Sequence, residues 1–189
     1  MGADIIRKVL SVSLAATALW ATVVAAQQPQ NWKPGIEKGI LPSDEPMQLD
    51  PNVVASLIAW IVTKTGWANA ELPQIVFVTK KQLTEMLLER PNAPPEDVHC
   101  QALYSRNDEI IYLTKDWRCS DLRDRGNLLH ELVHHLQKLN NVKARCIAEF
   151  ERQAYDLQLE WLREHDVQDP YKFLDIDEFT VRMISQCRE

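Results

Sequence analysis

The fold of this chain is decided by residues 128–137, which read LLHELVHHLQ in one-letter code. Two histidines of this stretch, His130 and His134, stand four residues apart, which places them on one face of an α-helix. From that face both imidazoles can reach a single Zn²⁺ at about 2.0–2.1 Å. Leucine and valine residues cover the other sides of the same helix. The stretch therefore predicts a buried helix that carries two metal ligands.

Glu131 is the candidate general base of this motif. It follows the first histidine and is turned away from the ligand direction, but its carboxylate can reach a water molecule beside the metal. Zinc lowers the pKa of such a water to about 7, and a carboxylate can take its proton as it attacks a carbonyl. The next histidine, His135, lies about 100° around the helix from His134 and is assigned to packing or to the surface.

The third ligand has to come from another segment. The longer metzincin pattern requires Gly and His where this chain has Gln137 and Asn140. The next predicted helix, residues 142–165, offers Glu149 and Glu151. At about 100° per residue, Glu151 lies on the flank of the buried face, whereas Glu149 points towards solvent. Glu151 is therefore the predicted third ligand, and a water molecule is the alternative.

Residues 129–137, followed by the pattern E-x-x-A-Y-x-x-Q at residues 151–158, resemble small zinc metallopeptidase domains of the gluzincin type. The resemblance covers about residues 109–161 and is closest to short exported bacterial proteins that combine HExxH with a downstream E-x-x-A-Y helix. Tyr155 departs from some membrane-bound gluzincins, which have Asp at this position. The resemblance implies a zinc site on the two motif histidines and a glutamate, with the motif glutamate as base. It implies no particular substrate.

Two further features are candidates for roles in catalysis. Tyr155 is a candidate donor to the oxyanion of a tetrahedral intermediate, and aromatic packing beside the site is the alternative. The strand predicted at residues 109–114 lies shortly before the motif helix. In zincin-like folds an edge strand in this position pairs with an extended substrate, and an ordinary core hairpin is the alternative.

The remaining sequence pattern predicts one α+β domain. Helices are expected at residues 50–66, 80–89, 121–139, 142–165 and 177–185, a strand at 75–79, and a hairpin of strands 101–105 and 109–114. The expected architecture is a single zincin-like domain over residues 50–189. A small antiparallel or mixed sheet packs on the active-site helix and on a second long helix.

The N-terminal residues have the pattern of a secretory signal peptide. Arg7 and Lys8 precede an uncharged apolar run at residues 9–26, which ends in Val-Ala-Ala. Such a pattern predicts cleavage after residue 26. An uncleaved anchor is the alternative, because the run is just long enough to span a bilayer. We expect a periplasmic or secreted chain without stable membrane association after cleavage, in which residues 27–49 form an extended lead-in.

Export changes the interpretation of the four cysteines, which all follow the predicted cleavage site. An even number of cysteines in an exported chain predicts two disulfides. The favoured pairs are Cys100–Cys119, across the hairpin, and Cys146–Cys187, from the start of a helix to the C-terminal tail. Buried free thiols are the alternative.

The composition limits the classes of function. The chain has 189 residues, 46% of them hydrophobic, and a net charge of −6, so it lacks the basic footprint of a nucleic-acid binder. The sequence predicts a secreted or periplasmic zinc-dependent hydrolase, most simply a metallopeptidase that acts on a peptide or protein. A zinc-stabilised binding module without turnover and a zinc amidase are the alternatives. The intact Glu131 favours an enzyme, because a purely structural site needs no base beside its ligand.

Overall fold

The computed structural model describes residues 49–97 and 100–187, so the predicted signal peptide and nearly all of the lead-in lie outside the described residues. The elements, in chain order, are α2 (Pro51–Thr65), β1 (Gln74–Val78), α3 (Lys80–Leu87), a 3₁₀ turn (Pro95–Asp97), β2 (Ala102–Ser105), β3 (Ile110–Thr114), α4 (Leu122–Leu139), α5 (Ile147–Glu164), α6 (Pro170–Leu174) and α7 (Glu178–Ile184). The predicted α+β class is confirmed. The one helix that was not predicted is α6, and α5 begins five residues later than expected.

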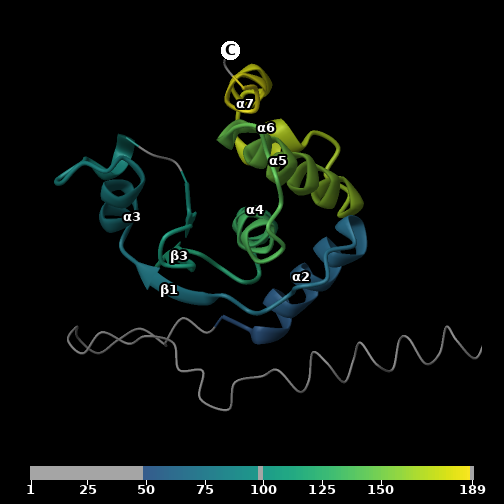
Figure 1. Cartoon of the computed structure of the whole chain (residues 1–189). Coiled ribbons are helices and arrows are strands. Elements are labelled where there is room, and N and C mark those ends of the chain that lie inside the picture. Colours follow the sequence, from purple (N-terminus) through teal and green to yellow (C-terminus); the bar gives the residue numbers. More distant parts are fainter. Residues whose placement is uncertain (1–48, 98–99, 188–189) are drawn as a thin grey trace, which may run out of the picture. The chain divides into compact units, whose positions relative to one another are not determined.

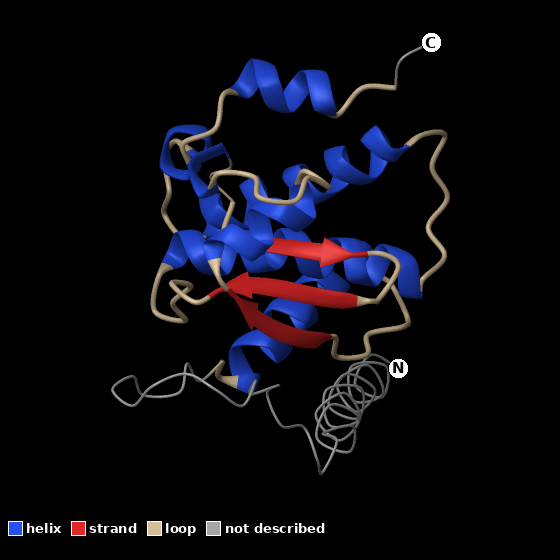
Figure 2. Cartoon of the chain, turned by 90° about the vertical axis from the view of Figure 1, so that its left-hand side faces the viewer, coloured by secondary structure: helices blue, strands red, loops and turns tan. Residues whose placement is uncertain are grey.

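The sheet is mixed and has three strands, with β3 between β1 and β2. β3 pairs parallel with β1 and antiparallel with β2, and Figure 2 shows one strand running against the other two. The expectation that residues 109–114 form the edge strand beside the site is therefore wrong. β3 is the central strand, and its residues Ile111 and Leu113 are fully buried. The edge that packs against α4 is β2.

The motif helix α4 occupies the centre of the domain, between the sheet and α5 (Figure 1). Its five apolar side chains around the motif are completely buried: Leu128, Leu129, Leu132, Val133 and Leu136. On another side, α4 packs against the buried face of α2. Between Leu128 and Gln137 every residue of α4 except Glu131 is buried, so the polar groups of this stretch have positions fixed by packing.

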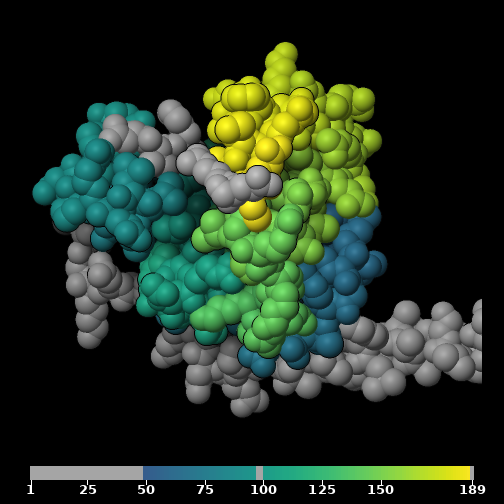
Figure 3. Space-filling view, turned by 45° about the horizontal axis from the view of Figure 1, so that its top comes forward, coloured from purple at the N-terminus to yellow at the C-terminus, as the bar shows by residue number. Residues whose placement is uncertain are grey.

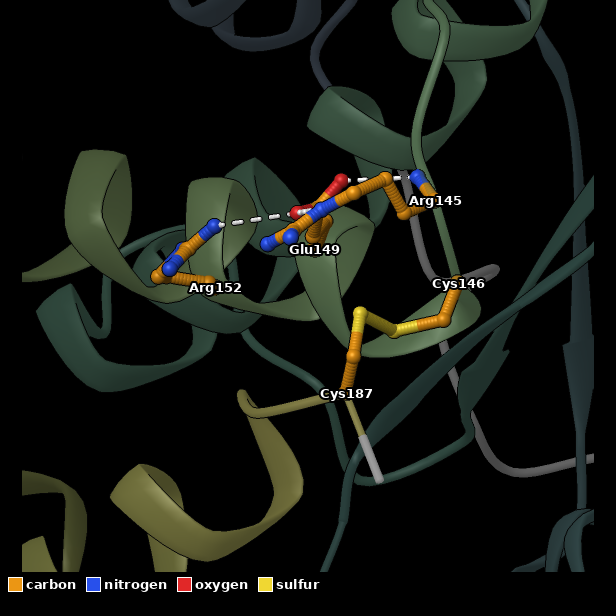
Figure 4. The surroundings of a disulfide bond; sticks show 5 residues. All are labelled: Arg145, Cys146, Glu149, Arg152 and Cys187. Atoms are coloured by element: carbon orange, nitrogen blue, oxygen red, sulfur yellow. Dashed lines mark hydrogen bonds and ion pairs between the residues drawn. A yellow bond between two sulfur atoms is a disulfide. The ribbon is translucent and has the colours of Figure 1, made fainter. Parts of the chain in front are cut away.

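The two long helices begin in different ways. The side chain of Asp121 caps α4 by accepting hydrogen bonds from the backbone amides of Arg123 and Asp124 at 2.7 and 3.3 Å. The start of α5 has no side-chain cap at Cys146. Instead, Cys146 forms a disulfide with Cys187, as predicted, and the bond ties the C-terminal segment to this helix start (Figure 4).

The other predicted disulfide is wrong, because Cys100 and Cys119 are free thiols. The last paired residue of β3 is Thr114, and Cys119 follows in the loop before α4, where it packs against the hydrophobic core. Cys100 instead lines the cleft described below. Burial, the dominant cause, and the charge of Glu131 raise the pKa of the Cys100 thiol to about 11, although Lys80 opposes this shift.

The C-terminal helices α6 and α7 pack on α5, and in Figure 3 this yellow segment lies against the yellow-green α5. Across residues 49–97 and 100–187, none of the helices has both the length and the apolar character that crossing a bilayer requires. The Cys146–Cys187 disulfide is typical of an oxidising, extracytoplasmic compartment.

Candidate metal centre

Three side chains from α4 and α5 meet at one point. The Nε2 atoms of His130 and His134 lie 3.1 Å apart. One carboxylate oxygen of Glu151 lies 3.4 Å from the first Nε2, and the other oxygen lies 3.4 Å from the second. Both imidazoles are buried and the carboxylate is half-buried. The three residues form a group that can hold a metal ion.

The spacing of these atoms fits zinc. Ligands bound tetrahedrally at 2.0–2.1 Å are separated from each other by about 3.3–3.4 Å. The two Nε2 atoms lie 3.1 Å apart, and each lies 3.4 Å from a different oxygen of Glu151, so each separation is close to this value. The donor set of two imidazoles and one carboxylate is also the set that zinc uses in hydrolases, with its fourth position left open.

The hydrogen bonds of Gln137 determine which nitrogen of His134 faces the site. The Gln137 amide nitrogen donates to the backbone oxygen of Phe150 at 3.0 Å and to Oε1 of Gln153 at 3.1 Å. Its oxygen therefore faces Nδ1 of His134, 3.0 Å away. Because that oxygen can only accept a hydrogen bond, Nδ1 must carry the proton. Nε2 is then unprotonated, and its lone pair is directed at the site.

Gln158 makes the same arrangement at His130. Its Oε1 lies 3.2 Å from Nδ1 of His130, and its Nε2 donates to Oδ1 of Asn127 at 3.2 Å. Both histidines thus present lone pairs to each other and to the carboxylate of Glu151. Several acceptors that converge at contact distance repel one another unless a cation lies between them, so this chemistry also fits a bound metal.

The electrostatics of the triad show the same attraction for positive charge. Burial alone would raise the pKa of Glu151, but the two imidazoles, when they carry a proton at Nε2, donate hydrogen bonds and add positive charge that outweigh it and hold that pKa well below its ordinary value. Burial would also lower the pKa of His134, but the nearby carboxylates of Glu151 and Glu131 raise it.

Glu151, and not Glu149, lies beside the two histidines, and its role as the third metal ligand stays a prediction. Glu149 lies on the opposite side of α5, where it accepts hydrogen bonds from the backbone amide and Nε of Arg145 at 2.8 and 2.7 Å. Arg152 is its second ion-pair partner, at 3.7 Å (Figure 4). The helical phase of the apolar residues in α5 was sufficient to separate the two glutamates.

The candidate base Glu131 is held by the sheet. One of its oxygens, Oε2, accepts a hydrogen bond from the backbone amide of Tyr104 at 2.8 Å. Tyr104 belongs to β2, so the edge strand and the motif helix are joined at this carboxylate. The bond leaves the second oxygen, Oε1, for another partner.

A cleft of about 780 Å³ opens beside the triad. It is lined by the start of β2, the N-terminal half of α4, Tyr155 and Gln158 of α5, and residues 173–176. The ring of Tyr155 lies 4.5 Å from the ring of His130, between centroids. Burial, together with the charges of Glu151 and Glu131, raises the pKa of Tyr155 to about 12, so its hydroxyl is a proton donor at neutral pH.

The third histidine of the motif stretch, His135, lies outside the site, as the sequence predicted. It is buried, its Nε2 donates to the backbone oxygen of Glu71 at 3.0 Å, and its ring meets Tyr104 edge-on. Burial lowers the pKa of His135, so it is neutral at physiological pH.

The sequence analysis did not predict that Gln137 and Gln158 are the hydrogen-bond partners of His134 and His130. The one available signal was their placement near the motif and on the flank of α5.

One protein family, described as a domain of unknown function (DUF6647), matches residues 46–189. The chain belongs to the DUF6647 family. No curated protein and no solved structure matches the chain. The match includes the whole of the triad, so this DUF6647 domain contains a group that can hold a metal and that resembles an HExxH…E zinc site.

Proposed function

We propose that this DUF6647 protein is a zinc-dependent hydrolase that cleaves peptide amide bonds. The observation that carries the proposal is the convergence of the triad, in which the two Nε2 atoms lie 3.1 Å apart and each lies 3.4 Å from an oxygen of Glu151, close to the separation of ligands around zinc. A second acidic group, Glu131, lies next to the triad and lines the cleft together with His130. A structural zinc site would be closed by a fourth ligand, whereas this triad borders a cleft.

Each residue has a defined role in the proposal. His130, His134 and Glu151 would hold the zinc, which when bound would activate a water and polarise the substrate carbonyl. Glu131 takes the proton at Oε1 and delivers it to the leaving amine, because its Oε2 is held by the amide of Tyr104. Its position is thereby fixed relative to both the helix and the sheet.

Tyr155 is the proposed electrophile. Its hydroxyl is protonated at neutral pH, since burial raises its pKa to about 12. A hydrogen bond from this phenol stabilises the negative charge that develops on the carbonyl oxygen. The proposal assigns Tyr155 a role in turnover and none in holding the metal.

The proposed setting is the periplasm or the outside of the cell. The signal-peptide pattern of residues 1–26 and the Cys146–Cys187 disulfide support it. Peptides or proteins of that compartment are then the substrates, and no nucleic-acid partner is proposed.

The test measures metal content and peptide hydrolysis in the exported protein. We expect one zinc per chain and hydrolysis of a mixed peptide library that a chelator abolishes and added zinc restores. Glu131→Gln should keep the zinc and reduce hydrolysis by about a thousandfold or more, which is the order of loss expected when a general base is removed. Glu149→Gln is the matched control and should retain activity. Tightly bound zinc without hydrolysis of any peptide would instead identify a binding module.

A further inference from the structure

The cleft beside the triad has two walls that come from different elements. One wall is the start of β2, with Cys100 and Ala102, and the other contains Tyr155 and Gln158 of α5. Along the floor, the cleft follows α4 from Asp121 to the motif. A substrate that reaches Glu131 through this cleft therefore approaches from the N-terminal end of α4.

Beyond the motif the two walls meet. Arg106, which directly follows β2, places its guanidinium over the ring of Phe150 on α5, 4.4 Å from the ring centroid. The backbone oxygen of Phe150 is in turn bound by Gln137 of α4. Strand, motif helix and α5 are thus linked on the side of the triad opposite to the cleft.

Lys138 reinforces this closed end from α4. Its ammonium group donates to the backbone oxygen of Arg106 at 2.5 Å and pairs with Glu109 at 2.8 Å. The turn between β2 and β3 is therefore fixed to the last turn of the motif helix. A peptide chain cannot pass between β2 and α5 here without breaking these contacts.

The edge of β2 is also occupied at this end. In an antiparallel pair, alternate residues direct their backbone groups away from the partner strand. Tyr104 is one of these residues, and its outward amide is bound to Glu131. Ala102, two residues earlier, lies in the open cleft. Strand addition by a substrate can therefore use the edge at Ala102 but has no free amide at Tyr104.

We infer that the enzyme acts on the end of a peptide chain, because the cleft extends from the triad in one direction only. The inference rests on the proposed function and names its substrate class. The chain of the substrate lies in the open cleft, and only a terminal residue fits between the scissile bond and the barrier of Arg106 and Phe150. Long chains are cleaved next to one end and not in their interior.

The experiment compares four forms of one peptide of about ten residues, with both ends free, with the N-terminus acetylated, with the C-terminus amidated, and with both ends blocked. Products of the zinc-loaded protein are identified by mass spectrometry. We expect release of single terminal residues, and internal cleavage of the doubly blocked peptide at least about 100-fold slower, because a misfitting group in a closed site costs about 10–200-fold. The two singly blocked forms identify which terminus enters the closed end.

A variant of the barrier sharpens the test. Arg106→Ala removes the guanidinium over Phe150 and should raise cleavage at the second bond relative to the first by about tenfold or more. Lys115→Ala, an exposed lysine outside the cleft lining, is the control and should leave this ratio unchanged. An unchanged ratio in Arg106→Ala would overturn the assignment of the barrier.

The remaining outcomes separate the inference from the proposed function. Rapid internal cleavage of the doubly blocked peptide, lost in Glu131→Gln, would overturn the end-directed specificity and leave the hydrolase in place. No cleavage of any of the four peptides by the zinc-loaded protein would overturn both.

Discussion

At its start, helix α5 carries one glutamate on its inner face, towards the histidines, and one on its outer face, and the two have different partners. On the outer face, Glu149 is bound by the backbone and guanidinium of Arg145, which lower its pKa, and also pairs with Arg152. On the inner face, Glu151 meets two imidazoles whose other nitrogens are held by glutamines. Glu149 has permanent cations as partners, whereas Glu151 is placed among groups that are neutral in the arrangement described. The charge of the outer glutamate is thus balanced by arginine, whereas the charge of the inner glutamate is balanced only when a cation binds.

The largest expected effect comes from exchanging the two glutamates for glutamine, one at a time. Glu151→Gln should weaken zinc binding by more than about 100-fold, since changes outside the ligand set already cost about 10–100-fold. Glu149→Gln should change the zinc affinity by less than about twofold, because Glu149 lies on the opposite side of α5 from the histidines and is bound to Arg145. Competition with a chromophoric chelator measures both, and the reverse order would remove Glu151 from the ligand set.

A smaller effect is expected from the glutamine that orients His134. Gln137→Met removes the acceptor at Nδ1 and should weaken zinc binding by about 10–100-fold. Gln153→Met is the matched control, because it removes a hydrogen bond from the same amide and leaves His134 untouched. If both variants lose affinity equally, the effect reports packing between α4 and α5 and not the orientation of the histidine.

The smallest effect on the site is expected from the disulfide. Replacing Cys146 and Cys187 together by alanine should lower the free energy of unfolding by about 2–4 kcal/mol, because the unfolded chain gains freedom. The zinc affinity should stay within about twofold of the original, since the bond lies at the start of α5, away from the triad.

The control for this prediction is the double variant Cys100→Ala and Cys119→Ala, in which two free thiols are lost. Its free energy of unfolding should not fall by the amount expected from the disulfide, because no cross-link that restricts the unfolded chain is removed. Non-reducing peptide mapping verifies the bonding, and a Cys100–Cys119 peptide would contradict the thiol assignment.

The positions of site residues could be predicted from the sequence wherever they depend on the geometry of a single helix. The four-residue spacing of His130 and His134 requires only a helix, and the position of Glu151 follows from the phase of its apolar neighbours. Both depend on local geometry that the chain dictates by itself. The helices and strands were found for the same reason, and most boundaries agree to within a few residues.

Features that depend on distant partners could not be predicted in this way. The parallel pairing of β1 with β3 requires a crossover through α3, and no local pattern places β3 in the centre instead of at the edge. The role of Gln137 depends on a carbonyl of α5 that fixes its amide. The cysteine pair Cys100–Cys119 was inferred from flanking positions along the hairpin, but such positions do not determine where the side chains lie.

The bond between Glu131 and the amide of Tyr104 ties the candidate site to both layers of the domain. The candidate ligands lie on the two long helices, whereas the carboxylate of the proposed base, on α4, is also bound to the sheet. A small sliding of β2 over α4 would change the distance between base and metal without altering a single ligand. Fully buried packing residues such as Leu132 of α4 would therefore set the alignment of the catalytic groups in the proposed enzyme.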